Sequence, residues 1–456
     1  MDKRWKTDLA PVCAGLGILM LVASAAVCLM LEQGGWLDRT GIAVVLAVLA
    51  AVSLFLLRLE GADREELWIM LLPIGAAMLV RALSMDHISG DYVSFLRNWA
   101  AFFRTYGGFS ALANSVGNYN MPYLYYVAFM SYIDVPDLYM YKLFSILFDV
   151  VLAWGCLRLV RCLVRGHRGS EAPLVAFAGA LLLPVVVLNG AYWGQCDVIY
   201  GALCIHAVVA VMEGKNKTSV ALMAVAFSFK LQAVFVLPLW GVLWLAKKVK
   251  FWELWVFPLT YLATILPAMV MGKPLMDILG IYFGQMMEVP NLVLNAASMY
   301  QFIPADLHAQ LAEGGLASAV GIAAAAALVL VLMALGFRLG ERLDRDVTMT
   351  MAVVLAIGVP FFLPHMHERY FFLADVFTLC WACANVRRLP VAVLAGGASL
   401  AGYMVYLRQR YNFVLRLGGA RFGMPLEALA MLAALIVSIC VLTEQLRGAK
   451  SREGLT

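Results

Sequence analysis

The sequence predicts an all-α polytopic membrane protein, and three observations carry this prediction. The chain has 456 residues, of which 63% are hydrophobic and only 14% are charged, so it lacks the charged shell that a soluble globule needs. Apolar runs long enough to cross a bilayer recur along the chain, separated by charges or by Gly and Pro. No soluble domain of any size fits between them, so we expect one transmembrane domain over residues 1–456.

About fourteen apolar runs are candidate membrane helices, with thirteen as the alternative count. The first, Pro11 to Leu31, is too long for the apolar core of a signal peptide, so we expect an uncleaved helix. The candidates cover residues 11–31, 41–58, 67–85, 137–160, 173–189, 197–213, 218–229, 230–247, 253–271, 316–338, 347–363, 368–386, 389–407 and 424–445.

The distribution of Lys and Arg predicts the orientation, because loops that stay in the cytoplasm are rich in these residues. Most of the 34 basic residues fall in alternate loops and in the two terminal segments. An even number of spans then places both termini on the cytoplasmic side. These basic positions are 3, 4 and 6, 58 and 64, 158 to 168, 215 and 217, 247 to 250, 338 to 345, 387 and 388, and 447 to 452.

Residues 218–247 allow two topologies. A twelve-residue helix over 218–229 reaches only about 18 Å, short of a hydrocarbon core of about 30 Å. Either two short helices meet within the membrane near Lys230, or one long helix crosses it and the later topology inverts. Basic residues after positions 338 and 387 favour two short helices.

Two outer segments, residues 86–136 and 272–315, are unusually long for connections between spans. In the first, the stretch DYVSFLRNWAAFFRTYGGF carries aromatic residues at helical spacing, with Arg97, Asn98 and Arg104 between them. This pattern predicts a helix that lies in the membrane interface. A connector packed on the outer face explains the aromatic residues equally well.

Two polar stretches on the predicted outer face suggest a functional site. Asp91 follows a glycine and precedes the aromatic helix, so it is either the N-cap of that helix or a general base. In NGAYWGQCD, Gln195 and Asp197 are either capping groups or ligands of sugar hydroxyls. We expect Tyr192 and Trp193 at the level of the lipid headgroups.

A second group of polar residues lies in FSFKLQ and PHMHERY. Lys230 is surrounded by apolar sequence, so it either serves a functional site or pairs with Asp149. His365, His367, Glu368 and Arg369 could form a metal site, a salt-linked helix start or an anion site. An arginine at a helix start opposes a metal ion and favours an anion. Phosphate headgroups, a lipid-linked phosphate substrate or the opposite orientation of the chain would each explain four further arginines in the last outer loop, Arg408, Arg410, Arg416 and Arg421.

These pieces resemble the GT-C superfamily of integral-membrane glycosyltransferases, in particular the bacterial mannosyltransferase-like branch related to protein-O-mannosyl and GPI-anchor mannosyltransferases. The resemblance covers about Leu67 to Leu407 and rests on SGDYVSFLRNW, NGAYWGQCDVIYGAL, FSFKLQAVFVLP and FLPHMHERYFFLAD. Residues 1–66 depart from the pattern, because they add two N-terminal spans. No DxD motif of nucleotide-sugar enzymes occurs in the predicted outer loops.

The resemblance implies an inverting hexosyltransferase that moves a sugar such as mannose or glucose from a polyprenyl-phosphate carrier to an acceptor hydroxyl of a lipid, glycan or protein. The reaction would take place at the extracytoplasmic face of the inner (plasma) membrane, without a cofactor or a metal ion and without nucleic acid. Asp91 would be the base. His365, His367, Arg369 and Lys230 would bind the donor phosphate. Tyr92, Gln195, Asp197, Glu368 and Tyr370 would contact the substrates.

Two other functions fit the same residues. A transporter or flippase of a lipid-linked sugar would use ionisable groups within the membrane, and Lys230 and Asp149 favour it. A ligase that uses a pyrophosphate-linked oligosaccharide would differ only in its donor.

Overall fold

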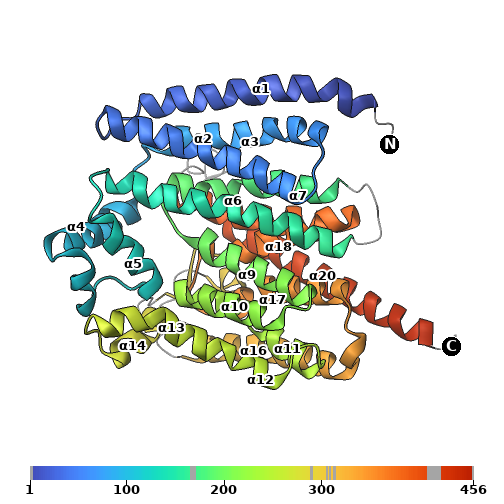
Figure 1. Ribbon diagram of the computed structural model, residues 1–456. Coiled ribbons are helices and arrows are strands. Elements are labelled where there is room, and N and C mark those ends of the chain that lie inside the picture. Colours follow the sequence, from blue (N-terminus) through green and yellow to red (C-terminus); the bar gives the residue numbers. More distant parts are fainter. Residues whose placement is uncertain are drawn as a thin grey trace. The chain divides into compact units, whose positions relative to one another are not determined.

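A computed structural model describes residues 4–164, 171–287, 291–304, 307, 310–311, 315–407 and 423–453. The chain is helical, as predicted, and divides into two compact units (Figure 1). Unit 1 comprises Met1–Arg158, Gly169–Ala202 and Ile265–Ile278. Unit 2 comprises Leu159–Arg168, Leu203–Thr264 and Leu279–Thr456.

Within the described residues, nine helices are long and apolar enough to cross a membrane, or ten if one bent pair counts as a single span. The bent pair joins Ala172–Leu182 to Pro184–Trp193 at an angle of 41°. The chain is therefore a multi-pass membrane protein. Each of the other four predicted spans coincides with a helix that is too short by itself, because 13 to 16 residues reach only about 20 to 24 Å. The number fourteen stays a prediction.

Unit 1 begins with three long helices, α1 (Arg4–Leu29), α2 (Trp36–Leu59) and α3 (Arg64–Ser84), and α1 packs on both others (Figure 1). The unit continues with η1 (Tyr92–Leu96), α4 (Arg97–Thr105), η2 (Gly108–Ala113), α5 (Met121–Met130) and most of α6 (Asp137–Leu163). It is completed by α7 (Ala172–Leu182), α8 (Pro184–Val187), η3 (Leu188–Trp193), the start of α9 (Asp197–Met212), and the adjoining parts of α13 (Val256–Val270) and α14 (Leu275–Met287).

A close contact between α1 and α3 depends on glycine. A Cβ built on Gly17 would lie 2.4 Å from the Leu71 carbonyl, and one on Gly75 would lie 2.4 Å from the Gly17 carbonyl oxygen. We therefore expect Gly17→Ala to lower the free energy of unfolding by about 1 to 3 kcal/mol, because the backbone of α3 has to move. The thermal unfolding midpoint in detergent measures this loss.

Gly15 is the matched control for this prediction, since it lies on the same helix and a Cβ there meets nothing within 4 Å. Gly15→Ala is expected to leave the midpoint unchanged or to raise it slightly, because alanine favours a helix over glycine by about 1 kcal/mol. Equal midpoints for the two variants would contradict the role of the α1–α3 contact.

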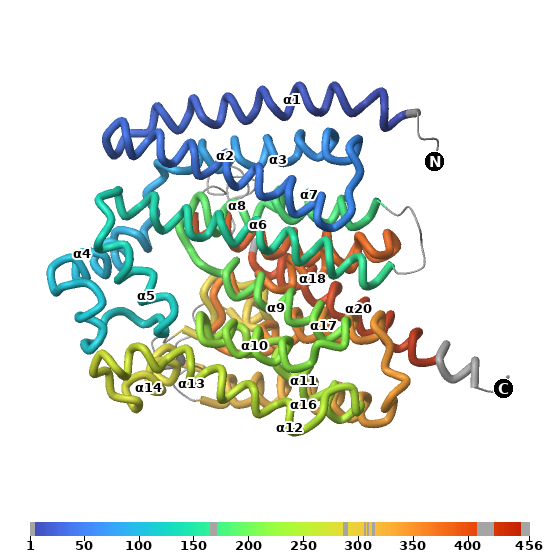
Figure 2. Tube along the Cα trace, in the orientation of Figure 1, coloured from blue at the N-terminus to red at the C-terminus, as the bar shows by residue number. Residues whose placement is uncertain are grey.

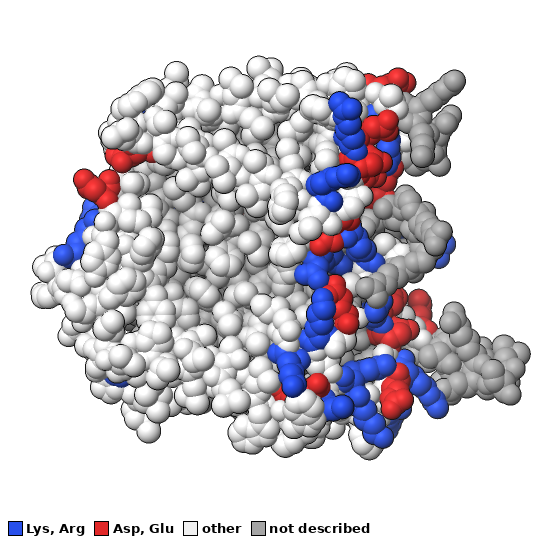
Figure 3. Space-filling view, viewed as in Figure 1, with Lys and Arg blue, Asp and Glu red and all other residues white. Residues whose placement is uncertain are grey.

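Charged side chains gather at one end of the helices of unit 1. Lys6 pairs with Glu66 at 2.9 Å and with Glu171 at 3.1 Å, and Arg158 lies 3.7 Å from Glu60. Figure 3 shows charged side chains gathered around the N-terminal end of α1, while the flank of the helix in this view is uncharged. Asp86 marks the other end, where its carboxylate accepts from the Glu32 backbone N–H and the Tyr139 hydroxyl.

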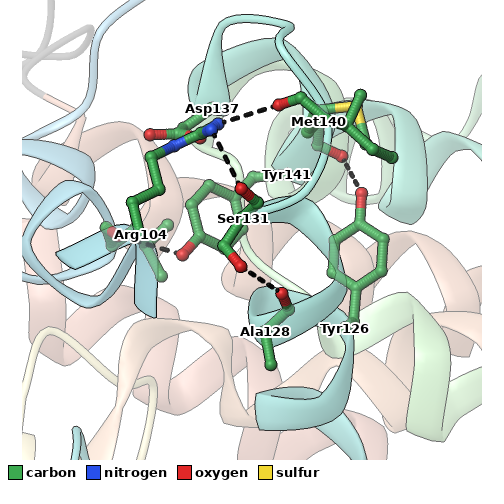
Figure 4. A network of polar contacts seen from close by, with 9 residues as sticks. Arg104, Tyr126, Ala128, Ser131, Asp137, Met140 and Tyr141 are labelled. Atoms are coloured by element: carbon green, nitrogen blue, oxygen red, sulfur yellow. Dashed lines mark hydrogen bonds and ion pairs between the residues drawn. The ribbon is translucent and has the colours of Figure 1, made fainter. Parts of the chain in front are cut away.

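The predicted aromatic helix of the first outer segment is α4, and it is amphipathic as expected. Trp99 and Phe103 are buried, whereas Arg97 and Arg104 are exposed. Arg104 donates to Asp137 at 2.5 Å and to the carbonyls of Ser131 and Ile133, which ties α4 to the start of α6 (Figure 4). These contacts agree with the alternative of a connector packed on the outer face. The location of α4 in the membrane interface stays a prediction.

In unit 2, the Cα trace runs through the rest of α9, then α10 (Asn216–Phe229), η4 (Leu231–Phe235), α11 (Pro238–Leu245) and α12 (Phe251–Leu254) (Figure 2). Later elements are β1 (Val293–Leu294), η5 (Met299–Phe302), α16 (Leu316–Leu339), η7 (Gly340–Arg342) and α17 (Arg345–Phe362). The last are β2 (Met366–His367), η8 (Glu368–Phe371), α18 (Phe372–Ala384), η9 (Val386–Arg388), α19 (Leu389–Tyr406) and α20 (Gly423–Glu453). Helix α17 lies in the core and packs on α16, α18 and α20.

The chain breaks at Lys230, which confirms two short helices over one long helix. Helix α10 ends at Phe229, and Lys230 adopts an extended backbone with φ −155° and ψ 136°. A short 3₁₀ segment and α11 follow. The four arginines of the last outer loop lie outside the described residues.

Candidate functional site

Asp91 lies at the end of unit 1 opposite the charged cluster of Lys6. Helix α3 starts at that cluster, where Glu66 pairs with Lys6, and ends at Ser84, shortly before Asp91. Asp91 has a helical backbone and makes no capping hydrogen bond, so its interpretation as an N-cap is wrong. The Ser89 hydroxyl accepts from the Tyr92 N–H instead. The carboxylate of Asp91 is half-buried.

Two side chains, one from the end of η3 and one from the loop after it, hold this carboxylate. Gln195 Nε2 donates a short hydrogen bond to Oδ2 of Asp91, and Trp193 Nε1 donates to the same oxygen at 3.1 Å. The Tyr119 hydroxyl donates to Gln195 Oε1 at 2.9 Å, which fixes the amide with its nitrogen toward Asp91. The structure thus brings together the first and second polar stretches that the sequence singled out.

The backbone of the loop is fixed to the segment before Asp91 as well. The Ser89 hydroxyl donates to the Trp193 carbonyl at 2.7 Å, and the rings of His87 and Tyr192 stack with centroids 3.6 Å apart. Burial lowers the pKa of His87, and the charge of Lys142 lowers it further. A neutral ring suits this stacking.

Trp193 is fully buried, so its side chain packs against protein, and its depth at the level of the lipid headgroups stays a prediction. Asp197 is also fully buried: it accepts from Asn189 Nδ2 at 2.6 Å, and its own N–H donates to Asn189 Oδ1. This pairing corresponds to the structural alternative for Asp197. Tyr92 is buried, and burial raises its pKa.

The His–Arg motif of unit 2 starts with an unusual backbone. His365 has φ of +63°, a left-handed conformation that is rare for a residue with a side chain. Its backbone N–H donates to the Leu292 carbonyl at 2.7 Å, and its ring Nδ1 lies 2.8 Å from the Asn291 carbonyl, so it donates there. Strands β1 and β2 pair in parallel just beyond. The second outer segment therefore supports the motif, a contact that the sequence does not reveal.

Charged groups follow directly in the motif. Glu368 is buried, and its Oε1 lies 3.6 Å from Arg369 Nη1 and 4.0 Å from His367 Nδ1. The rings of His367 and Tyr370 lie 5.1 Å apart, and the Arg369 guanidinium lies 5.9 Å from the Tyr370 ring. The predicted salt-linked start is thus present, although the motif forms the short 3₁₀ helix η8 before α18.

Two positive groups surround His367. Burial, together with the charges of Arg369 and Lys230, lowers the pKa of His367 to about 3. Lys230 is itself buried. The predicted alternative of a Lys230–Asp149 pair is wrong, because Asp149 pairs with Arg81 at 2.8 Å and both side chains are fully buried.

This shift predicts a pH-dependent stability. An unfolded histidine titrates near 6.5, so between about pH 6.5 and pH 3 the unfolded chain binds one more proton than the folded chain. Stability therefore falls with falling pH. From pH 7 to pH 5 we expect a loss on the order of 1 to 2 kcal/mol, seen as a lower unfolding midpoint in detergent. His367→Gln should flatten this dependence, and an unchanged slope in that variant would contradict it.

Within the described part of the chain, no three His, Cys, Asp or Glu side chains come close enough to hold a metal ion. These residues therefore supply no third ligand that would complete a metal site with the histidines of PHMHERY.

The site contains residues that sequence reasoning missed, above all Tyr119 and Lys142. Lys142 is fully buried and donates to three carbonyls just before Asp91. A lysine, a serine and an aspartate at positions 142, 145 and 149 of one apolar helix were the available signal. Comparison of the sequence with protein-family models and with curated proteins gives no match.

Proposed function

We propose that the chain is an inverting glycosyltransferase of the GT-C type, with about fourteen membrane helices, that transfers a hexose such as mannose or glucose from a polyprenyl-phosphate carrier to an acceptor hydroxyl. One observation carries the proposal. The half-buried Asp91 carboxylate is held by Gln195 and Trp193 through one oxygen, at the end of unit 1 that is remote from Lys6 and Glu66. A carboxylate fixed in this way is suited to accept a proton.

The reaction in this proposal is a single displacement. The Asp91 carboxylate takes the proton of the acceptor hydroxyl, and the oxygen forms a bond to the anomeric carbon. The bond between that carbon and the phosphate oxygen breaks on the opposite face, which inverts the configuration. The leaving group is the polyprenyl phosphate. Gln195 and Trp193 keep the carboxylate oriented, since each donates to Oδ2.

The cationic residues of unit 2 would bind the donor phosphate. Arg369 supplies a planar fork that matches phosphate oxygens, and Lys230 adds a second positive charge. His365 already donates its Nδ1–H to a carbonyl, and the lowered pKa of His367 keeps that ring neutral at pH 7. Arg369 and Lys230 therefore supply the charge that stabilises the leaving phosphate.

The orientation in the proposal follows from the charges of unit 1. Lys6, Arg58 and Arg158 belong to the end that also holds the start of α3. The positive-inside rule assigns this end to the cytoplasm, so that Asp91 faces the extracytoplasmic side of the plasma membrane and the N-terminus is cytoplasmic. An even number of spans would place the C-terminus on the same side.

Transport of a lipid-linked sugar is the second candidate. It was favoured by two ionisable groups in apolar sequence, Lys230 and Asp149. The Arg81–Asp149 ion pair gives Asp149 a structural partner, which leaves Lys230 as the feature that favours transport.

A transfer assay separates the two functions. Purified protein in detergent is incubated with a polyprenyl-phosphate hexose labelled in the sugar, and the products are separated by phase partition and chromatography. Release or transfer of the sugar with inverted configuration supports the enzyme. Stoichiometric binding of the intact donor without turnover, across mannose and glucose donors, would support transport and overturn the proposal.

A further inference from the structure

Three polar side chains form a stripe along α6, whose other charged residues lie near its two ends. Lys142, Ser145 and Asp149 follow one another at spacings of three and four residues, which places them on one face. Each of these three residues is at most 1% exposed. We name them the α6 stripe. Burying a lysine and an aspartate in a membrane helix is costly, so each requires good partners.

Lys142 fixes the segment that leads to Asp91. Its ammonium group donates to the carbonyls of Ser84 at 2.7 Å, Met85 at 2.8 Å and His87 at 2.7 Å. An ammonium has three N–H donors, so all of them are used. The carbonyls belong to the last turn of α3 and to the residues just after it. Lys142 thereby determines the path of the chain from the end of α3 at Ser84 to His87, which lies four residues before Asp91.

Ser145 fixes the loop that carries Gln195. Its hydroxyl donates to the Gln195 carbonyl at 2.6 Å, while the Gln195 side chain donates to Asp91. The loop approaches this face closely, because a Cβ built on Gly190 would lie 3.0 Å from the Ser145 Cβ. Asp149 completes the stripe through its ion pair with Arg81 of α3.

Helix α6 therefore holds both the segment before Asp91 and the loop that carries Gln195. We propose that the α6 stripe positions Asp91 against Gln195, and that Lys142 and Ser145 are positioning residues of this carboxylate. The kinetic consequence rests on the proposed function, whereas the positioning itself does not. A purely structural role, the attachment of α3 to α6, would be met by the Arg81–Asp149 pair and would not need a bond to the Gln195 carbonyl.

The test compares Ser145→Ala with Ser53→Ala. Ser53 is also a buried serine of unit 1, but it donates only to the Leu49 carbonyl of its own helix. The first readout is the rate at which a water-soluble carbodiimide and an amine label Asp91 in the detergent-solubilised full chain, followed by mass spectrometry. The second is the steady-state transfer rate.

Ser145→Ala is expected to raise the labelling rate of Asp91 several-fold, because Gln195 no longer holds the carboxylate. It is also expected to lower kcat by up to about 100-fold with little change in the KM for the donor, since misplacement of a reacting group acts on the chemical step. Ser53→Ala should change neither quantity. Adding Ser145→Ala to Gln195→Ala should then alter the labelling rate no further. Lys142→Met should act as Ser145→Ala does, and Ser145→Ala carries the test if that variant does not fold.

Identical labelling rates and kcat values for Ser145→Ala and Ser53→Ala would overturn the inference. So would a further rise in labelling when Ser145→Ala is added to Gln195→Ala, because Ser145 would then not act through Gln195. A wild-type protein that transfers no sugar would refute the proposed function alone, since the labelling rates still test the positioning.

Discussion

Asp91→Asn is expected to lower sugar transfer by about 100-fold to 10,000-fold, the range over which a positioned general base contributes to rate. An amide in place of the carboxylate has almost the same shape and keeps an acceptor oxygen for Gln195 and Trp193, which both donate to Oδ2 of Asp91. It does not accept a proton at neutral pH. The variant should therefore fold and bind the donor but should not turn it over. Initial rates with a labelled polyprenyl-phosphate hexose measure the effect, and the unfolding midpoint reports the fold.

Asp86→Asn is the matched control. Asp86 is a half-buried carboxylate at the same end of unit 1, only five residues earlier, and it accepts from the Tyr139 hydroxyl and the Glu32 N–H. Its amide is expected to leave the transfer rate within a few-fold of the wild type, because Asp86 serves the packing of α1, α3 and α6. Full turnover in Asp91→Asn would remove Asp91 from the role of base. Equal losses in both variants would indicate that the end of unit 1 had merely been disturbed.

The second large effect is expected for Arg369→Gln, at about 100-fold or more in kcat. The guanidinium would stabilise the charge that grows on the leaving phosphate, and the loss of one such donor costs about 100-fold to 1,000-fold in other enzymes. Arg369→Lys keeps the charge but loses the planar fork, so it should fall between the wild type and Arg369→Gln. A dependence of the rate on the leaving group would support this role: a carrier whose phosphate leaves more easily should narrow the gap between Arg369→Gln and the wild type.

Arg387→Gln is the control for this series. Arg387 is an exposed arginine of unit 2 in the short helix η9, and no step of the proposal uses it. Its replacement is expected to leave kcat unchanged. If Arg369→Gln and Arg387→Gln have the same kcat, Arg369 does not bind the leaving phosphate. A rise in the KM for the donor with kcat unchanged would instead assign Arg369 to binding of the ground state.

Local sequence patterns predicted most of the helices of this protein. The apolar runs from Pro11 to Leu31 and from residue 316 to 338 coincide with α1 and α16, because hydropathy and length are properties of a contiguous segment. The break at Lys230 was predictable only through the basic residues of later loops, because one long helix would have inverted the topology after it. The number of spans was not, since α9, α10 and α18 are too short for a length rule, and their surroundings in the folded protein decide how they are buried.

The partners of the polar residues depended on tertiary structure. The sequence singled out Asp91 and Gln195 separately, yet their hydrogen bond joins residues 104 positions apart. For Asp149, sparse charge in the sequence offered Lys230 as one possible partner, whereas the fold gives it Arg81, 68 positions away. In an apolar chain, each buried polar residue needs a hydrogen-bond or ion-pair partner. Periodicity within one helix does not reveal which other helix supplies that partner.

Composition and periodicity act over one helix at a time, and they suffice to identify a multi-pass helical membrane protein with polar residues concentrated in a few stretches. The packing of the helices adds that Trp193 and Gln195 hold Asp91 and that Tyr119 orients Gln195. It also adds that one face of α6 carries both Lys142, which holds the segment before Asp91, and Ser145, which holds the Gln195 backbone. The physical reason is that a buried hydrogen bond depends on direction and distance between groups far apart in the chain, which only the packing of the helices fixes.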